Sequence, residues 1–133
     1  MSPCFIINVR NERVVLIVQV LKDELRHKIL LESEHLFLQR GYDRTSLQMI
    51  ADKVNISKSN LYHYFKNKEE LFYELTDSAA DGLKRMILRF RSMRFDLNMD
   101  AQEFRMLLTE EVLSLLLAEK YGLLLIMEQA NGT

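Results

Sequence analysis

Four helix-start patterns divide most of this chain into helical segments. They are Thr45-Ser46-Leu47-Gln48, Ser57, Asn67-Lys68-Glu69-Glu70 and Asp100-Ala101-Gln102-Glu103. Each begins with a side chain that can accept hydrogen bonds from the unpaired N–H groups in the first turn of a helix. In the first pattern, Gln48 would also reach back to the N–H of Thr45, as in a capping box. Only four glycines and one proline accompany these patterns, too few for the turns of an all-β fold, so the sequence predicts an all-α protein.

Hydrophobic residues recur at helical spacing from Lys22 onward. Leu25, Ile29, Leu36 and Phe37 return to one face of a predicted helix. Gly41 can end that helix because glycine adopts left-handed backbone without a steric penalty. Asn55 is expected in the left-handed region as well, between two short helices. The later helices are predicted at about 45–54, 57–64, 68–90, 101–118 and 120–129.

Residues 1–20 differ in composition from the rest of the chain. They are rich in valine, isoleucine and asparagine, and they hold the only proline and the only cysteine, Cys4. We predict that this stretch is strand-like or irregular, and we assign residues 1–21 to an irregular or artefactual extension. The single cysteine excludes an internal disulfide framework.

Neither of the two most apolar stretches is expected to enter a membrane. Val14–Leu21 is shorter than the roughly 20 residues that a spanning helix needs. Leu107–Ile126 is longer but contains Glu110, Glu111, Glu119 and Lys120. A buried helix or helix pair is the better interpretation of the second stretch.

The segment from Thr45 to Tyr64 has the form of a helix-turn-helix, with two short capped helices and a tight turn at Asn55. Positive charge is concentrated there. Residues 44–68 carry five lysines and arginines and one aspartate, a net charge of +4 in a chain whose total is −1. Such a local excess is what a site for a nucleic acid duplex requires. A solvated helical surface would show the same caps, so the pattern alone leaves both interpretations open.

Residues 29–72 resemble the DNA-binding domain of TetR-family transcriptional regulators. The matching positions are Ile29-Leu30, Leu36-Phe37, Gly41-Tyr42, Thr45-Ser46, Ile50-Ala51, Asn55-Ile56-Ser57, Leu61-Tyr62, Tyr64-Phe65 and Lys68-Glu69-Glu70-Leu71. The chain departs from the family pattern at Asn55, where a glycine is usual, at Ser59, and at Glu32-Ser33, where two alanines are usual. The resemblance implies a helix-turn-helix domain over residues 22–71, followed by a ligand-binding and dimerisation region over residues 72–133.

The resemblance also implies which side chains would meet DNA. Ser57 would cap the recognition helix, and Asn60 and Lys58 would read adenine and guanine edges in the major groove. Thr45 would cap the preceding helix while contacting phosphate, and Tyr62 would either contact phosphate or lie half in the core. The complete predicted DNA-binding set is Thr45, Ser57, Lys58, Ser59, Asn60, Tyr62, His63, Tyr64 and Lys68.

In TetR-like regulators the second domain binds a ligand and forms the dimer. Met86, Phe90, Phe104 and Met127 are candidates for lining a site for a small apolar or amphipathic ligand, because methionine and phenylalanine adapt to varied apolar shapes. Core packing is the ordinary role of such residues. The family's dimer interface uses later helices than those present here. A homodimer is therefore expected of the intact protein but doubtful for this chain, which we interpret as truncated at its C-terminus.

No enzyme class is indicated. Glu32-x-x-His35 matches half of a di-iron motif, which needs a second such pair and two more glutamates. The glycines are too scattered for a phosphate-binding loop, and no catalytic triad is suggested. We predict no metal and no cofactor.

The sequence thus indicates a cytoplasmic, TetR-like regulator that binds double-stranded DNA, most simply as a ligand-responsive repressor on a palindromic operator. The alternative is a helical protein-interaction module without sequence-specific DNA binding. Salt separates the two, because the affinity of a protein for DNA falls steeply as the salt concentration rises and the release of counterions becomes less favourable.

Overall fold

The computed structural model describes residues 4–93 and 99–132, with side chains from residue 11 onward. Within these ranges every regular element is a helix, which confirms the predicted all-α class. The helices are α1 (Cys4–Arg40), α2 (Leu47–Val54), α3 (Lys58–Tyr62), α4 (Lys68–Met93) and α5 (Ala101–Asn131).

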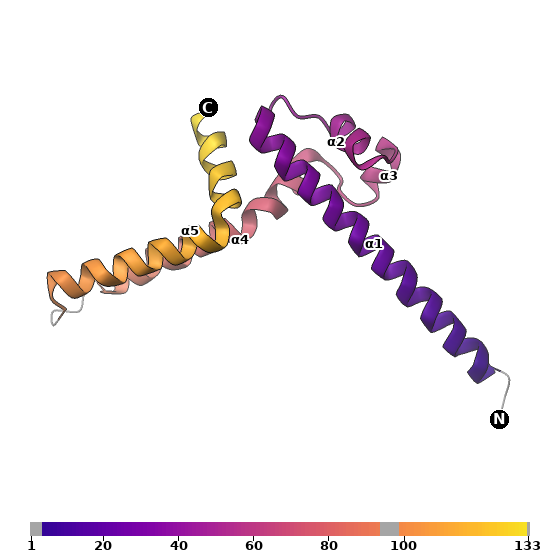
Figure 1. Cartoon of the computed structure of the whole chain (residues 1–133), viewed down its shortest axis with the longest axis horizontal. Helices are drawn as coiled ribbons and strands as arrows, with labels where there is room; N and C mark the ends of the chain where they lie inside the picture. Colours follow the sequence, from indigo (N-terminus) through magenta and orange to yellow (C-terminus); the bar gives the residue numbers. More distant parts are fainter. Residues whose placement is uncertain (1–3, 94–98, 133) are drawn as a thin grey trace.

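The molecule is elongated (Figure 1). α2 and α3 lie against the C-terminal half of α1, and the N-terminal half of α1 projects to one side. α4 and the first part of α5 run side by side toward the other side. The accessible surface is 10305 Å², against about 7,300 Å² for a compact protein of this mass. An elongated molecule exposes more surface than a compact one of the same mass.

Residues 1–21 were predicted to be strand-like or irregular, and this prediction is wrong for residues 4–21. α1 is continuous from Cys4, so the extension and the first predicted helix are one helix of 37 residues. The helical penalty of a valine or isoleucine is only a few tenths of a kcal/mol. No glycine or proline lies between Cys4 and Arg40 to stop a helix that has already formed. Residues 1–3 and the side chain of Cys4 lie outside the described part.

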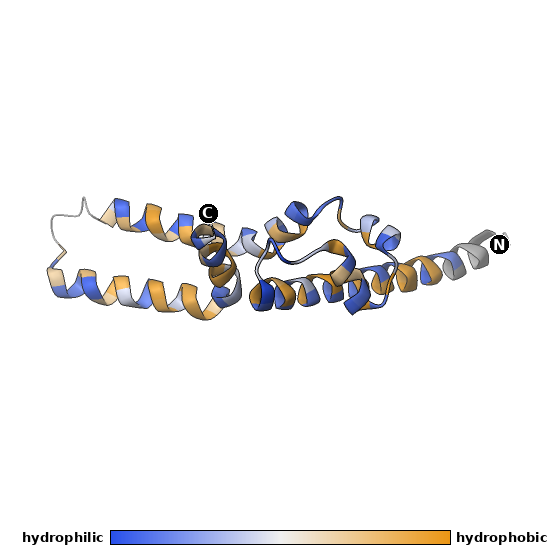
Figure 2. Cartoon of the chain, turned by 90° about the horizontal axis from the view of Figure 1, so that it is seen from above, coloured by the Kyte–Doolittle hydropathy of each residue, from blue (hydrophilic) through white to orange (hydrophobic). Residues whose placement is uncertain are grey.

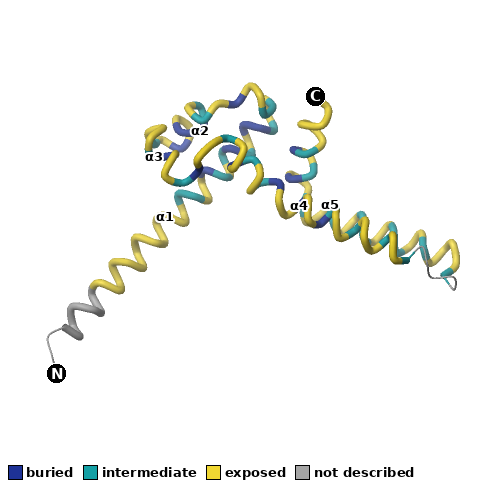
Figure 3. Tube along the Cα trace, turned by 180° about the vertical axis from the view of Figure 1, so that it is seen from behind, coloured by how far each residue is buried: buried dark blue, intermediate teal, exposed yellow. Residues whose placement is uncertain are grey.

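The N-terminal half of α1 has little packing. Every side chain from Asn11 to Glu24 is exposed, including the aliphatic run Val14–Val18. Outside its grey end, Figure 2 shows hydrophobic residues along this part of the helix, and Figure 3 shows it as exposed. Among the described residues no helix is both long enough and apolar enough to cross a membrane.

The hydrophobic core lies where the C-terminal half of α1 meets α2, α3 and the start of α4 (Figure 3). The predicted apolar face of α1 is confirmed, because Ile29, Leu36 and Phe37 are buried and Leu25 packs beside them. The remaining buried core residues are Ile50, Ala51, Val54, Leu61, Phe65, Leu71 and Leu125. α1 ends at Arg40, and Gly41 follows with a φ of 84°, as its predicted role required.

Leu125 is the member of this core that comes from the far end of the chain. α5 is interrupted at Glu119, whose φ of −122° and ψ of 26° are not helical. This break separates the two helices predicted at 101–118 and 120–129. The side chain of Glu119 accepts a hydrogen bond from the Ser78 hydroxyl at 2.5 Å. After the break the last segment of α5 turns back, and Leu125 reaches the core with 2% of its surface exposed.

Candidate DNA-binding site

α2 is a short helix whose N-cap is Ser46. The Ser46 hydroxyl accepts a hydrogen bond from the N–H of Met49 at 3.2 Å. At the other end Asn55 adopts φ 62° and ψ 46°, and its N–H donates to the carbonyls of Ala51 and Asp52. The prediction of left-handed backbone at Asn55 is confirmed. The helix therefore stops sharply, and the chain turns directly into α3.

Substitutions of Asn55 test whether its left-handed backbone matters for stability. Replacing Asn55 by alanine should lower the free energy of unfolding by about 1 kcal/mol, because a Cβ that cannot hydrogen-bond locally disfavours left-handed backbone. Asn55→Gly should stay close to the wild type, since glycine tolerates that conformation. Urea unfolding followed by circular dichroism measures both. An equal loss in the two variants would assign the effect to the Asn55 amide instead of its backbone.

α3 begins at Lys58 and is capped by Ser57, as predicted. The Ser57 hydroxyl accepts a hydrogen bond from the N–H of Asn60 at 3.1 Å. One side of the helix is anchored, because Leu61 is fully buried. The helix-turn-helix arrangement is thus built from two caps, one left-handed residue and an apolar face on each helix.

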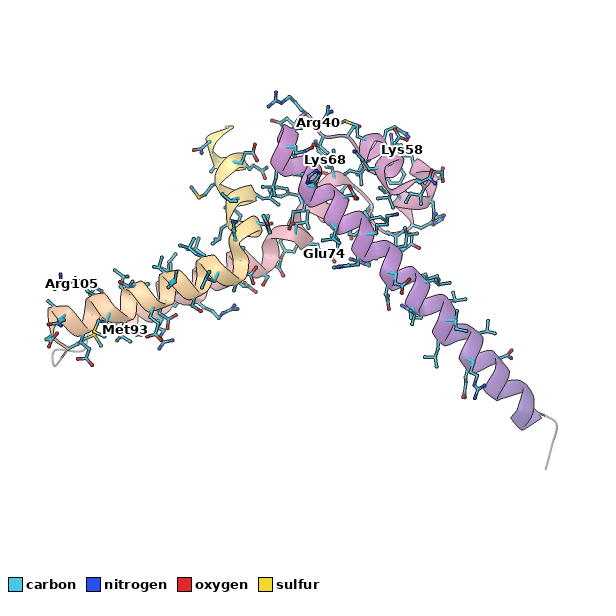
Figure 4. The ribbon with its side chains drawn as sticks, viewed as in Figure 1. Arg40, Lys58, Lys68, Glu74, Met93 and Arg105 are labelled. Atoms are coloured by element: carbon cyan, nitrogen blue, oxygen red, sulfur yellow. The ribbon has the colours of Figure 1, made fainter. Side chains whose placement is uncertain are left out.

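The other side of α3 carries the side chains that were predicted to face DNA. Lys58, Ser59 and His63 are exposed, and Asn60 is half-buried. The Lys58 ammonium lies 5.9 Å from the centre of the Tyr62 ring. Figure 4 shows Lys58 on the outer, α2–α3 side of the molecule.

The two tyrosines differ in their surroundings. Tyr62 has 46% of its surface exposed, so its ring lies mainly outside the core. Tyr64 packs partly against the core and is half-buried. Of the five cations in residues 44–68, four are exposed (Arg44, Lys53, Lys58 and Lys66).

Thr45 does not cap α2, and that prediction is wrong. It is 1% exposed, and its hydroxyl donates toward the carbonyl oxygens of Gly41 at 2.9 Å and Leu36 at 3.3 Å. Its neighbour Ser46 is the cap, and Gln48 donates to Asp52 instead of reaching back along the chain. Both Thr45 and Ser46 are good caps by residue type, and burial of the threonine methyl group selects between them. The side chain of Thr45 is therefore too enclosed to reach a phosphate.

Lys68 starts α4, and its ammonium points back at the turn between α1 and α2. Nζ donates to the carbonyl oxygens of Tyr42 at 2.8 Å and Thr45 at 3.1 Å. It also lies 4.1 Å from the centre of the Tyr42 ring. Sequence reasoning placed Lys68 on phosphate and missed these contacts. Asn67 precedes it as the predicted start of the helix, accepting from the N–H of Glu70 at 2.7 Å.

A link between α1 and α4 was also missed. The Arg26 guanidinium forms a two-pronged ion pair with the Glu74 carboxylate and lies 4.6 Å over the ring of Phe65. The Glu74 carboxylate raises the pKa of Arg26. These residues are 48 positions apart in the chain, so local patterns carry no signal for the pairing.

Comparison with known proteins agrees with this geometry. The sequence pattern of the family described as bacterial regulatory proteins, tetR family, matches residues 29–75. That range contains the core half of α1, the two capped helices and the start of α4. Residues 29–75 are a TetR-family domain.

Relatives of the TetR-family domain are transcriptional regulators. One is the biofilm operon icaADBC HTH-type negative transcriptional regulator IcaR of Staphylococcus epidermidis, 34% identical over 65 residues, 49% of this chain and 35% of the relative. Another is the HTH-type transcriptional activator FasR of Mycolicibacterium smegmatis, 34% identical over 62 residues, 47% of this chain and 28% of the relative. The matched part thus spans about a third of the length of these relatives. They are described as regulators and not as enzymes.

The fold extends beyond the TetR-family domain. The ketosteroid transcriptional regulator KstR2 of Mycobacterium tuberculosis superposes with a TM-score of 0.58 over 80% of this chain and 52% of that one, at 24% identity. The likeness shows that the long helices after the TetR-family domain follow the same fold.

The four candidate ligand residues lie in different surroundings. Phe90 and Phe104 face each other across the α4–α5 pair, with ring centres 6.3 Å apart. Met86 is half-buried, and Met127 is 61% exposed on the last segment of α5. An apolar cavity of about 290 Å³ on this pair is lined by other residues: Ala80, Leu83, Lys84, Ile87, Leu88 and Ile126.

The acidic and histidine side chains show no metal-binding arrangement in the described ranges. No group of three or more histidine, cysteine, aspartate or glutamate side chains comes together there. In the half-motif Glu32-x-x-His35, Glu32 is half-buried and His35 is exposed.

Proposed function

We propose that this chain is a DNA-binding transcriptional regulator whose reading element is α3. The observation that carries the proposal is a capped, exposed recognition helix inside a TetR-family domain. Lys58 and Ser59 are at its exposed start. Lysine and serine at the start of a helix-turn-helix recognition helix are placed to reach base edges and phosphates in the major groove.

The charge distribution supports a duplex as the partner. The exposed cations around the helix-turn-helix are not balanced locally, since Asp52 is the single acidic residue between positions 44 and 68. Neutralising phosphates with these side chains would release condensed counterions, which favours binding at low salt. The cytoplasm is the compartment in which such a regulator would meet DNA.

The wider activity that we propose follows the pattern of repressors. Two copies would bind a palindromic operator in successive major grooves. A small apolar or amphipathic ligand held by α4 and α5 would change the distance between the two α3 helices. The support for coupling is Leu125, because it connects the end of α5 directly to the core of the TetR-family domain. Such coupling needs a ligand that binds the two arrangements with different affinities.

Selection from a random duplex library with purified protein tests this proposal. A palindromic motif with half-sites about one helical turn apart is expected for a dimer. A single enriched half-site would support the reading element but contradict the dimer. No enrichment, together with no salt-dependent affinity for any duplex, would contradict DNA binding and favour a protein-interaction module.

Asn60 gives a sharper test of the reading helix. Replacing Asn60 by alanine should cost about 1–3 kcal/mol of binding free energy at one base pair and relax the preference there. The measurement is affinity for a set of duplexes that carry each base in turn at every position of the enriched motif. Equal loss on all duplexes would show that Asn60 does not read a base.

A further inference from the structure

We propose that Lys68 is a positioning residue that closes the helix-turn-helix unit and thereby sets where α3 lies, a role that rests on the DNA-binding function proposed above. Its hydrogen bonds to the carbonyl oxygens of Tyr42 and Thr45 are here named the Lys68 tether. Through its bond to Thr45, the tether joins the two ends of the segment 46–67, because Thr45 directly precedes that segment and Lys68 directly follows it. That segment contains both α2 and α3.

The tether holds both ends of a single tight turn. The N–H of Thr45 donates to the carbonyl of Tyr42 at 3.3 Å, and the same two residues supply the carbonyls that Lys68 binds. The Thr45 hydroxyl fixes the turn from inside, because its single O–H points toward the carbonyl oxygens of Gly41 at 2.9 Å and Leu36 at 3.3 Å. The backbone immediately before the Ser46 cap therefore has a defined position relative to the start of α4.

The surroundings of Lys68 explain why a cation lies at this helix start. The positive end of the α4 dipole disfavours a lysine in the first turn. Two carbonyl oxygens and the face of the Tyr42 ring offset this cost by giving the ammonium three electron-rich neighbours. Since an ammonium has three N–H donors, the tether occupies two of them. One N–H remains for any other partner, so the tether takes most of the hydrogen-bonding capacity of this ammonium.

Tyr42 is itself fixed, so the tether has a firm attachment. Its ring contacts those of Phe37 and Phe72 at centre distances of 5.5 and 5.0 Å. Burial, followed by the neighbouring Glu69 carboxylate, raises the pKa of Tyr42 to about 12. The first two residues of α4 therefore both contact this turn. Lys68 binds its backbone carbonyls, and Glu69 acts on the hydroxyl of Tyr42.

Lys68→Met tests the tether, because methionine keeps an apolar side chain of similar length but removes the donors. Lys66→Met is the matched control, since it removes the same charge from an exposed side chain two residues earlier. Lys68→Arg keeps the donors and should restore most of the wild-type behaviour. Far-UV circular dichroism verifies that each variant is folded.

Amide hydrogen exchange in the free protein measures the tether itself. In Lys68→Met, exchange at Thr45 and Met49 should accelerate at least about tenfold, as expected for loss of a charge-assisted hydrogen bond. Exchange in the core half of α1 should not change. Lys66→Met should match the wild type at all of these amides. Unchanged exchange at Thr45 and Met49 in a folded Lys68→Met protein would overturn the tether.

DNA binding measures the positioning role. On the duplex enriched by selection, Lys68→Met should lose about tenfold in the ratio of specific to non-specific affinity, with the wild-type salt slope. Lys66→Met removes one of the exposed cations proposed to neutralise phosphates, so it should lower the salt slope but keep that ratio. If Lys68 were instead a phosphate contact, Lys68→Met would reduce the salt slope by about 0.9 and leave the ratio of specific to non-specific affinity unchanged. That result would overturn the positioning role. If the wild type enriches no duplex, the proposed function and the positioning role both fail, whereas the exchange result still decides the tether.

Discussion

Replacing Phe65 by alanine is expected to lower the free energy of unfolding by about 3–5 kcal/mol. Phe65 is fully buried at the point where α3 gives way to α4, and its N–H donates to the carbonyl of Leu61 at 3.1 Å. The Arg26 guanidinium covers its ring. The variant would therefore lose apolar burial, leave a cavity in the core and remove the surface on which Arg26 rests.

Urea unfolding followed by circular dichroism measures the effect. Tyr73→Ala is the control, because Tyr73 is an aromatic residue of α4 that is 67% exposed, and truncating it should change stability far less. A loss of less than about 1 kcal/mol for Phe65→Ala, the size of an ordinary substitution, would mean that the connection between α3 and α4 repacks around the vacated space.

Replacing Gly122 by valine should lower the free energy of unfolding by about 1–3 kcal/mol. A Cβ on Gly122 would lie 2.7 Å from the Cβ of Ala79 and 3.3 Å from the carbonyl oxygen of Leu75. Both neighbours belong to α4, and neither is the end of a flexible side chain. α5 would have to move away from α4 at the place where its last segment turns toward the core.

Gly132→Val is the matched control for this variant. A Cβ there would meet only backbone oxygens of its own helix end, at 3.6 and 3.7 Å. Thermal unfolding gives the stability difference, and limited proteolysis should show earlier cleavage after Glu119 in Gly122→Val alone. Similar behaviour of the two glycine variants would mean that α4 and α5 are not in close contact at Gly122.

Sequence patterns predicted the features of this fold that depend on a few adjacent residues. The caps at Ser57, Asn67 and Asp100 and the left-handed Asn55 are short-range effects, because the donor and acceptor groups lie within three or four residues. The break at Glu119 was also located. It falls between the helices predicted at about 101–118 and 120–129.

Other features could not be predicted because they depend on distant packing. Whether Thr45 or Ser46 caps α2 is decided by which side chain the core encloses. The Arg26–Glu74 pair, the Lys68 tether and the burial of Leu125 each join residues far apart in the chain. In α1 the error was of another kind, because β-branched composition was given more weight than the absence of any helix-stopping residue.

Because α1 is one continuous helix, a small rotation at its buried end moves its exposed end through a large distance. A helix of 37 residues is about 55 Å long at 1.5 Å per residue, and its C-terminal half is embedded in the core that supports α3. A rotation of about 10° at that core would move the far end of the helix by about 5 Å at a distance of roughly 30 Å. Small rotations of the helix-turn-helix would therefore move the start of α1 far enough for a spectroscopic probe placed there to detect them.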